Sequence, residues 1–391
     1  MTQETPGSDG AGAPVRLRQP DGPADASKLV RADRSTDDST DETVALVAQV
    51  LGFDGRVAPA LEWAATVGRV APLPGGGDTA RLWELLASTA AADVGVARIL
   101  EPHLDALAIL AAAGGVDLEQ VDAGSTSTWG VYAAEGPGVR VTATQHAGGW
   151  TLDGVKPWCS LARDLSHALV TAWTDDGRRL FAVDLRSTAV AADAGPWVAR
   201  GLAQVVSAPV RFDSAPAVPV GDTGWYLSRP GFAWGGIGVA ACWWGGAVGV
   251  ARDVFAACTR REPDQLALAH LGAIDTALAG ARAVLLDAGG VVDGRVRDES
   301  PLEPTTPGRS SPEESAVPPG VLARRTRNVV ARAVEETLAR AAHALGPAPL
   351  AHDERHARRV ADLALYVRQH HAERDDAALG RDLVAHGTLP W

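Results

Sequence analysis

Apolar residues at three- and four-residue spacings predict helices over residues 41–122. The segments DETVALVAQVLG and TARLWELLASTAAADVGVARILEPHLDALAIL place Leu, Val, Ile and Ala at these spacings. This is the period of a helix that buries one face. We therefore expect an N-terminal helical domain at residues 39–123.

The pattern changes to a two-residue period over residues 124–221. The segments GVRVTATQ, GWTLDGVKPW, HALVTAW and RRLFAVDL alternate or carry β-branched and aromatic residues, and AGG and DDG turn signals separate them. Short strands at this spacing are typical of a sandwich or barrel of about 100 residues. We expect a central β domain at residues 124–222.

Helical periodicity returns after Phe232. One segment carries an apolar stripe at Val330, Val334, Leu338, Ala341 and Leu345. Gly346 and Pro347 follow as a helix stop signal. A last long helix is expected over residues 354–375, and these helices together predict a third domain at residues 223–391.

Two segments show no periodic apolar pattern. Residues 1–38 are rich in Gly, Pro, Asp and Ser, and residues 293–320 contain DESPLEPTTPGRSSPEESAVPPG. Both carry too little apolar surface to offset the entropy of ordering, so we expect a disordered tail and a disordered linker. Helices, then strands, then helices indicate a multi-domain α+β protein.

Composition narrows the class of protein. The formal net charge of -12 argues against a nucleic-acid surface, which needs clustered Lys and Arg. Three cysteines without metal-finger spacing, and no export signal, favour the cytoplasm. The charge-free run from Pro230 to Ala251 could span a bilayer by length. Its seven glycines and its central Trp243 and Trp244 favour a buried helix of a soluble protein.

Two short segments give information beyond the order of the domains. GGWTLDGVKPWCSLARDLSHALVTAW contains a Trp, an Asp-Gly turn, a Lys and Trp158-Cys159-Ser160, and ARGLAQVVSAPVRFDSAPAVP contains a Gly, a Phe-Asp and a Val-Pro. These segments resemble segments of the acyl-CoA dehydrogenase family. Together with the order of the domains, the resemblance covers roughly residues 41–391, without the linker. The resemblance implies an N-terminal helical domain, a central β domain and a C-terminal four-helix bundle, with FAD held between the last two.

The resemblance also implies cofactor-binding residues. Trp158, Cys159 and Ser160 occupy the family's Trp-Ile-Thr positions, so Trp158 is expected to pack on the isoalloxazine and Ser160 to hydrogen-bond near N5. The alternative is a buried Trp at a strand end, followed by a turn Ser.

The loop WGVYAAEGPG corresponds to the family's Thr-Glu-Pro…Gly-Ser-Asp segment under the flavin. Ala134 and Glu135 are nearest to Thr-Glu, and no Gly-Ser-Asp follows. Tyr132 or backbone amides are expected to substitute, although an ordinary β-turn explains the glycines equally well.

The resemblance places the catalytic carboxylate at Asp353, beside Glu354. In the family a carboxylate removes the α-proton of a thioester while hydride leaves to the flavin, and such a base must be positioned and partly desolvated. Asp353 also stands at a predicted helix start, where it suits an N-cap. Both interpretations stay open.

Nearby histidines carry weaker signals. His352 and His356 have a spacing that can chelate a metal on a helix, but no third ligand supports them, so no metal site is expected. Residues 370–375 occupy the family's Glu-Gly-Thr cofactor turn. The glycine is missing there, so we expect the helix to continue.

Three functions are compatible with these residues. The leading one is FAD-dependent α,β-dehydrogenation of an acyl-CoA or related acyl thioester, in a homodimer or homotetramer. The second is a flavin-dependent monooxygenase or hydroxylase of the same fold, since relatives that lack the Glu act in this way. The third is a retired subunit that binds acyl groups or FAD without catalysis. The sequence leaves the electron acceptor open.

Overall fold

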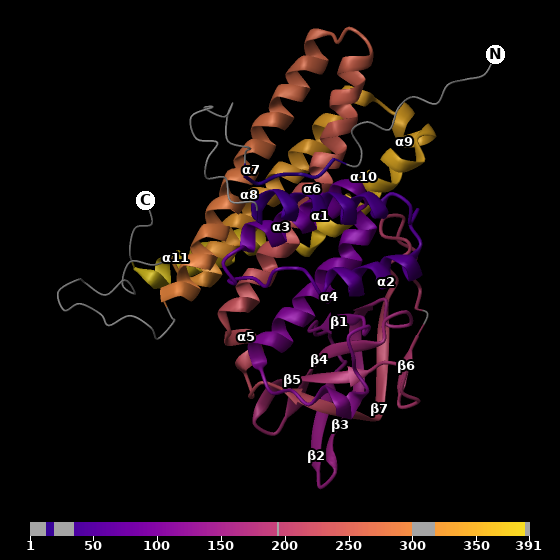
Figure 1. Cartoon of the computed structure of the whole chain (residues 1–391), viewed down its shortest axis with the longest axis vertical. Coiled ribbons are helices and arrows are strands. Elements are labelled where there is room, and N and C mark those ends of the chain that lie inside the picture. The colour runs from indigo at the N-terminus through magenta and orange to yellow at the C-terminus, as the bar shows by residue number, and fades with distance from the viewer. Residues whose placement is uncertain (1–12, 19–34, 194, 299–316, 388–391) are drawn as a thin grey trace, which may run out of the picture. The chain divides into compact units, whose positions relative to one another are not determined.

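The structure, a computed structural model, describes residues 13–18, 35–193, 195–298 and 317–387. The chain divides into two compact units, each assembled from separate stretches. The first, called the sheet unit here, comprises Gly55–Ala71 and Gly95–Gly235. The second, called the bundle unit, comprises Met1–Asp54, Pro72–Val94 and Gly236–Trp391. Figure 1 labels the elements of each.

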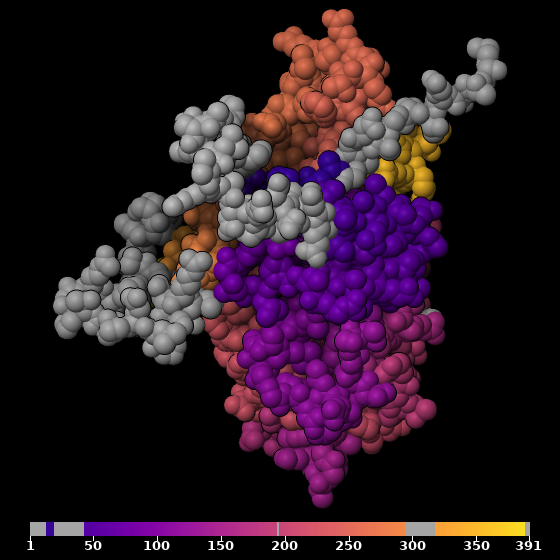
Figure 2. Space-filling view, viewed as in Figure 1, coloured from indigo at the N-terminus to yellow at the C-terminus, as the bar shows by residue number. Residues whose placement is uncertain are grey.

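The sheet unit is built around seven strands. They are β1 (Trp129–Tyr132), β2 (Val141–His146), β3 (Gly149–Ser160), β4 (His167–Thr174), β5 (Gly177–Asp184), β6 (Val190–Ala192) and β7 (Ser207–Val220). The strands follow the order β1-β4-β2-β3-β7-β5, and β5 also pairs with β4. The sheet therefore closes on itself as a barrel, one of the two architectures that the alternating pattern predicted. The β2–β3 hairpin projects from this unit (Figure 2).

Short helices complete the sheet unit. They are α2 (Val57–Val67), most of α4 (Val94–Ala113), η1 (Leu118–Val121) and α5 (Trp225–Ser228). Ala106 and Ile109 of α4 pack with Trp129, Leu169 and Leu180 of the sheet in one buried cluster. The apolar face of α4 and the apolar residues of the strands thus pack in one common core.

The bundle unit is helical. Its elements are α1 (Ser35–Val50), α3 (Thr79–Ala92), most of α6 (Pro230–Arg260), α7 (Gln265–Asp298), α8 (Pro319–Leu345), α9 (Ala348–His352), α10 (Glu354–Tyr366), η3 (Val367–Gln369) and α11 (Glu373–His386). The long helices α7 and α8 pack along one another, and α6 contacts both through Trp244, which donates to the Leu278 carbonyl, and Gly236, which accepts from Arg327 (Figure 1). The predicted fold class, helices before and after a central β region, is confirmed. The predicted domain bounds stay a prediction.

The glycines of α6 allow a close approach to α3. A Cβ at Gly245 would lie 2.0 Å from the Ala87 carbonyl oxygen, and one at Gly249 would lie 2.8 Å from the Ala91 carbonyl oxygen. Side chains at these positions would separate the two helices. The glycines of α6, which argued against a membrane span in the sequence, therefore allow close helix packing.

Two helices, α6 and α7, are long and apolar enough to cross a membrane. The apolar windows of both have a mean hydropathy of 1.2, but 67% of the α6 window is buried and only 17% of the α7 window. The ends of α6 and α7 that meet near residues 260–265 stand clear of the rest of the bundle unit in Figure 2. The predicted buried helix is observed at α6, whereas α7 leaves an apolar surface exposed.

Two segments predicted to be disordered are partly ordered. In the predicted tail, Val15 and Leu17 are buried, and the Val15 N–H donates to Ser88 Oγ at 2.9 Å. In the predicted linker, α7 continues to Asp298 because no proline interrupts it before that residue. The linker residues 299–316, and tail residues 1–12 and 19–34, lie outside the described residues.

The prediction of one continuous helix over residues 354–375 is wrong. α10 ends at Tyr366, a short 3-10 turn follows, and Ala372 adopts φ +49° before α11 begins at Glu373. Glu373, Asp375 and Asp376 lie in the first turn of α11, where negative charge stabilises a helix start. The chain therefore turns between α10 and α11 even without a glycine at this position.

Candidate functional site

Strand β3 changes its pairing with β7 just before it ends. The register shifts between Lys156 and Cys159, and inside this bulge Trp158 has φ +59°. A left-handed backbone at a large side chain costs on the order of 1–3 kcal/mol, and bulges re-aim side chains. Trp158 is 66% exposed. The strand therefore holds an indole at the surface at a conformational cost, which is typical of functional positions.

The hydroxyl of Ser160 lies in a polar cluster beside Trp158. Arg98 Nη2 of α4 donates to Ser160 Oγ at 3.2 Å, and Ser207 Oγ of β7 lies 2.7 Å from the same oxygen. The Tyr132 hydroxyl donates to the Ser160 carbonyl at 2.9 Å. Either hydroxyl of the Ser160–Ser207 pair can be the donor, and Ser207 Oγ also donates to the Val205 carbonyl at 3.4 Å.

Cys159 differs from its two neighbours. Its side chain is fully buried, and burial raises the pKa of the thiol to about 12 against the opposing charge of Lys156. A neutral thiol in the barrel core is an inert packing group. Of the predicted Trp158-Cys159-Ser160 set, Cys159 can meet a ligand only through its backbone.

The loop after β1 is fixed by ion pairs. Glu135 Oε1 lies 2.7 Å from Lys156 Nζ and 3.1 Å from Arg178 Nη2. Lys156 Nζ also donates to Thr171 Oγ1 at 2.9 Å, and Arg178 donates to the Ala133 carbonyl. Glu135 therefore anchors the loop, while its neighbour Ala134 is exposed.

Burial and charge act in opposite directions on this pair. Burial works to raise the pKa of Glu135, but the hydrogen bond from Lys156 and the charges of Lys156 and Arg178 outweigh it and lower that pKa. Burial lowers the pKa of Lys156, against the hydrogen bond to Glu135. A buried ammonium stays charged here because the carboxylate compensates it.

Helix α4 contributes a polar line to the sheet unit. Arg98, Glu101 and Asp105 follow one another at helical spacing, and Arg98 lies 3.7 Å from Glu101. Asp105 lies 3.8 Å from Arg229, whose side chain is almost fully buried. Burial raises the pKa of Asp105 to about 6, against the lowering charge of Arg229. Asp105 is the strongest candidate here for a carboxyl that exchanges a proton near neutrality.

The predicted catalytic carboxylates lie in a different setting. Asp353 is exposed, and its Oδ1 accepts the backbone N–H of His356 at 3.0 Å as the N-cap of α10. Glu354 is also exposed, in the first turn of the same helix. Neither carboxylate has the desolvated surroundings that a thioester α-proton abstraction requires.

A buried ion-pair cluster follows this cap. His356 Nδ1 lies 2.8 Å and Arg359 Nη1 lies 2.7 Å from the same Asp253 oxygen. Burial works to raise the pKa of Asp253, but the hydrogen bond from His356 and the charge of Arg359 lower it overall. The cluster ties α10 to α6. Within the part of the chain that the structure describes, no group of three His, Cys, Asp or Glu residues could hold a metal ion.

The structure brings most of the predicted cofactor residues together. Tyr132 hydrogen-bonds to Ser160 at the end of β3, two residues after the exposed Trp158. Sequence reasoning missed Arg98 and Ser207, which complete the cluster from α4 and β7. A charged residue inside the apolar segment VGVARIL was the available signal for Arg98. Ser207 gave none, because its role depends on strand pairing.

No protein-family model matches the sequence, and no curated protein matches it. Solved structures do match. The structure titled KijD3 in complex with FMN and dTDP-3-amino-2,3,6-trideoxy-4-keto-3-methyl-D-glucose is 18% identical, covers 91% of this chain and 95% of its own, and has a TM-score of 0.71. FMN-bound TdsC from Paenibacillus sp. A11-2 is 18% identical, covers 92% and 98%, and has a TM-score of 0.70.

A third structure decides the fold. Glutaryl-CoA dehydrogenase from Mycobacterium smegmatis is 16% identical, covers 91% of this chain and 96% of its own, and has a TM-score of 0.70. This chain has the acyl-CoA dehydrogenase fold. The resemblance in the short segments around Trp158 is thereby matched along nearly the whole chain. The neighbours with this fold include a protein named as a dibenzothiophene monooxygenase as well as a dehydrogenase, so the fold alone leaves the reaction open.

Proposed function

We propose that the protein is a flavin-dependent oxidoreductase and that its flavin binds at the end of β3. The exposed indole of Trp158 on a strained bulge is the observation that carries the proposal. The sequence resemblance points to FAD, whereas the matched structures of KijD3 and TdsC contain FMN. A flavin supplies the ability to accept or donate a hydride or single electrons.

The residues of the chain would hold and orient this group. Trp158 offers an aromatic face on which an isoalloxazine can stack. Ser160 offers a hydroxyl group that Arg98 and Ser207 hold in place. Tyr132 fixes the Ser160 backbone, and Glu135 fixes the loop that carries Ala134.

Flavin titration of variants tests the binding site. We expect Trp158→Ala to weaken FAD or FMN binding by about tenfold, because loss of a stacking face removes on the order of 1 kcal/mol or more. Trp150→Ala on the same strand is the matched control, since Trp150 packs on Phe181 instead. Equal weakening by both variants, or by neither, would contradict the proposed site.

Two reactions fit a flavin in this fold. α,β-Dehydrogenation of an acyl-CoA or acyl thioester needs a base, and Asp353 or Glu354 is the proposed residue. The exposed, capping state of Asp353 disfavours this role. Monooxygenation, in which a reduced flavin would supply two electrons and oxygen would be the oxidant, needs no such carboxylate, so the geometry at Asp353 favours it.

Two assays separate these reactions from each other and from a non-catalytic subunit. Dehydrogenation predicts that an acyl-CoA bleaches the bound flavin without oxygen, and that Asp353→Asn retains flavin but abolishes bleaching. Monooxygenation predicts oxygen consumption when reduced flavin is supplied, with no bleaching by acyl-CoA. A protein that binds no flavin would reject both reactions and leave the retired subunit.

We also propose that a second copy of the chain covers α7, in a homodimer or homotetramer. Leu266 and Leu268 are 70% and 52% exposed on a helix whose apolar window is mostly unburied. Exposed apolar side chains along a largely unburied helix are typical of subunit interfaces. A helix pairing with its own copy also forms a closed, symmetric contact.

Sedimentation measures this association. The double variant Leu266→Glu/Leu268→Glu should lower the mass of the particle, because it places charges in the contact. Val384→Glu on α11 is the control, since Val384 is even more exposed to solvent but lies on another helix. An unchanged mass in the double variant, or a monomeric parent protein, would contradict the proposal.

A further inference from the structure

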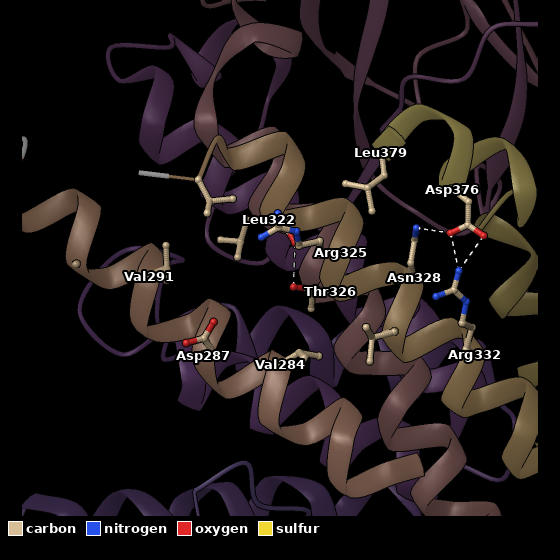
Figure 3. Close-up of a pocket in the computed structure, with 13 residues that line it drawn as sticks. Val284, Asp287, Val291, Leu322, Arg325, Thr326, Asn328, Arg332, Asp376 and Leu379 are labelled. Atoms are coloured by element: carbon tan, nitrogen blue, oxygen red, sulfur yellow. Dashed lines mark hydrogen bonds and ion pairs between the residues drawn. The ribbon is translucent and has the colours of Figure 1, made fainter. Parts of the chain in front are cut away.

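The bundle unit contains a cavity of about 670 Å³ between α7, α8 and α11 (Figure 3). Sites for small molecules commonly span about 300–1,000 Å³. The apolar part of the wall comprises Val284 and Val291 of α7, Leu322 and Val329 of α8, and Leu379 of α11. The cavity therefore has the size and the lining that an organic ligand requires.

One end of the cavity is closed by a satisfied polar network. Asn328 Nδ2 donates to Asp376 Oδ1 at 2.7 Å, and Arg332 donates to both Asp376 oxygens at 2.8 and 2.9 Å. His370 Nε2 lies 2.9 Å from Asn328 Oδ1. Because that amide oxygen can only accept, His370 carries a proton on Nε2. The network fixes α11 against α8 and compensates the charge of Arg332.

Arg325 is the lining cation that remains. Among the residues described by the structure, it forms no hydrogen bond or ion pair, and its side chain is half-buried. Thr326, next to it, donates its hydroxyl proton to the Leu322 carbonyl at 3.0 Å. Arg325 lines the cavity from α8 (Figure 3). A guanidinium beside apolar walls is a preferred partner for a carboxylate.

We infer that this cavity binds an amphipathic organic monoanion, with its carboxylate on Arg325 and its hydrocarbon body against the valine and leucine walls. The apolar wall provides the burial that binds the body, and Arg325 provides the charged hydrogen bonds that fix the head. This site consists of bundle-unit residues alone and does not use the proposed flavin residues.

Asp287 should make the site selective for ligands that carry a single negative charge. It extends from α7, on the other side of the cavity from Arg325 (Figure 3), and no partner compensates its charge among the described residues. A second anionic group on the ligand would approach this carboxylate and be repelled. The site should therefore prefer a monocarboxylate to a dicarboxylate of equal length.

Calorimetric titration of the purified protein with octanoate, octanol, octylamine and suberate tests the inference. We expect octanoate to bind about tenfold more tightly than octanol or octylamine, and suberate to bind more weakly than octanoate. Arg325→Gln should remove the advantage of octanoate over octanol. Arg355→Gln, which changes an exposed arginine of α10, should leave that advantage intact.

A second variant tests the place of binding. Val329→Trp should fill the cavity and abolish the binding of both octanoate and octanol, while an unchanged unfolding midpoint shows that the chain still folds. Octanoate that binds Arg325→Gln as tightly as the parent overturns the inference, as does tighter binding of octylamine. Displacement of octanoate by FMN or FAD also overturns it, because the cavity would then belong to the cofactor. A drop in particle mass on Arg325→Gln would assign the cavity to a subunit contact instead.

Discussion

The sequence predicted cofactor binding at the end of β3 and a catalytic carboxylate at the start of α10, and these two regions differ in local structure. At β3, a strained bulge presents Trp158, and buried groups hold Ser160 and the neighbouring loop in place. At α10, Asp353 and Glu354 face solvent, and one of them caps a helix. Cofactor binding is thus supported by costly local structure, whereas the predicted base is not.

The difference indicates which part of the resemblance transfers to this chain. Preorganised surroundings are what an active group requires, and only the β3 end shows them. The local structure therefore favours flavin binding at the end of β3, and it does not favour Asp353 or Glu354 as the catalytic base.

Glu135→Gln should lower the free energy of unfolding by about 3 kcal/mol, because it leaves the buried Lys156 ammonium without a carboxylate. Urea denaturation measures the loss. Glu336→Gln is the control, since it removes an exposed ion pair with Arg340 and should cost less than about 0.5 kcal/mol. Equal costs would show that the loop after β1 is not held as described.

Asp105 predicts a pH dependence for the sheet unit. Its pKa of about 6 exceeds the unfolded value of about 3.9, so folding favours the protonated carboxyl. Its stabilising contribution is present below about pH 4 and is lost as the pH rises through 6. Asp105→Asn should therefore flatten the pH dependence of the unfolding free energy between pH 4 and 6. A parallel pH profile for the variant and the parent would contradict the burial of this charge.

Trp158→Gly should raise the free energy of unfolding by about 1 kcal/mol while reducing flavin binding. Glycine tolerates the positive φ at this position, and the exposed indole contributes little burial in exchange. A gain in stability with a loss of function is the pattern expected of a strained functional residue. Thermal unfolding and flavin titration of the same preparation report both quantities. Loss of stability would show that the indole packs against protein.

Asp353 can be tested as a cap without knowledge of the substrate. Asp353→Ala should cost about 1 kcal/mol, and Asp353→Asn should cost almost nothing, since asparagine caps helices well. If Asp353 is also the base, both variants lose flavin reduction by an acyl-CoA, whatever their stability. A stable Asn variant with undiminished reduction assigns Asp353 to the helix alone.

Much of the fold follows from periodicity. The two-residue pattern of HALVTAW and RRLFAVDL predicted β4 and β5, and the glycine-rich run after Pro230 predicted a buried helix. The break at Ala372 could not be predicted, because nothing local requires a positive φ at an alanine. It depends on long-range contacts, such as that of His370 with Asn328.

The candidate site was less predictable. Trp158 and Ser160 came from a short segment, but the bulge that exposes Trp158 results from pairing with β7. Ser207 and Arg98 reach Ser160 from sequence separations of 47 and 62 residues. Contacts over such distances follow from the closed barrel and from the position of α4, which no local pattern encodes.

The visible absorption spectrum of the freshly purified protein tests the central claim most directly. Flavin binding at the end of β3 predicts the absorption bands of an oxidised flavin after gel filtration, at about one flavin per chain, and their loss from Trp158→Ala prepared in the same way. A colourless parent protein that takes up neither FAD nor FMN would contradict the claim.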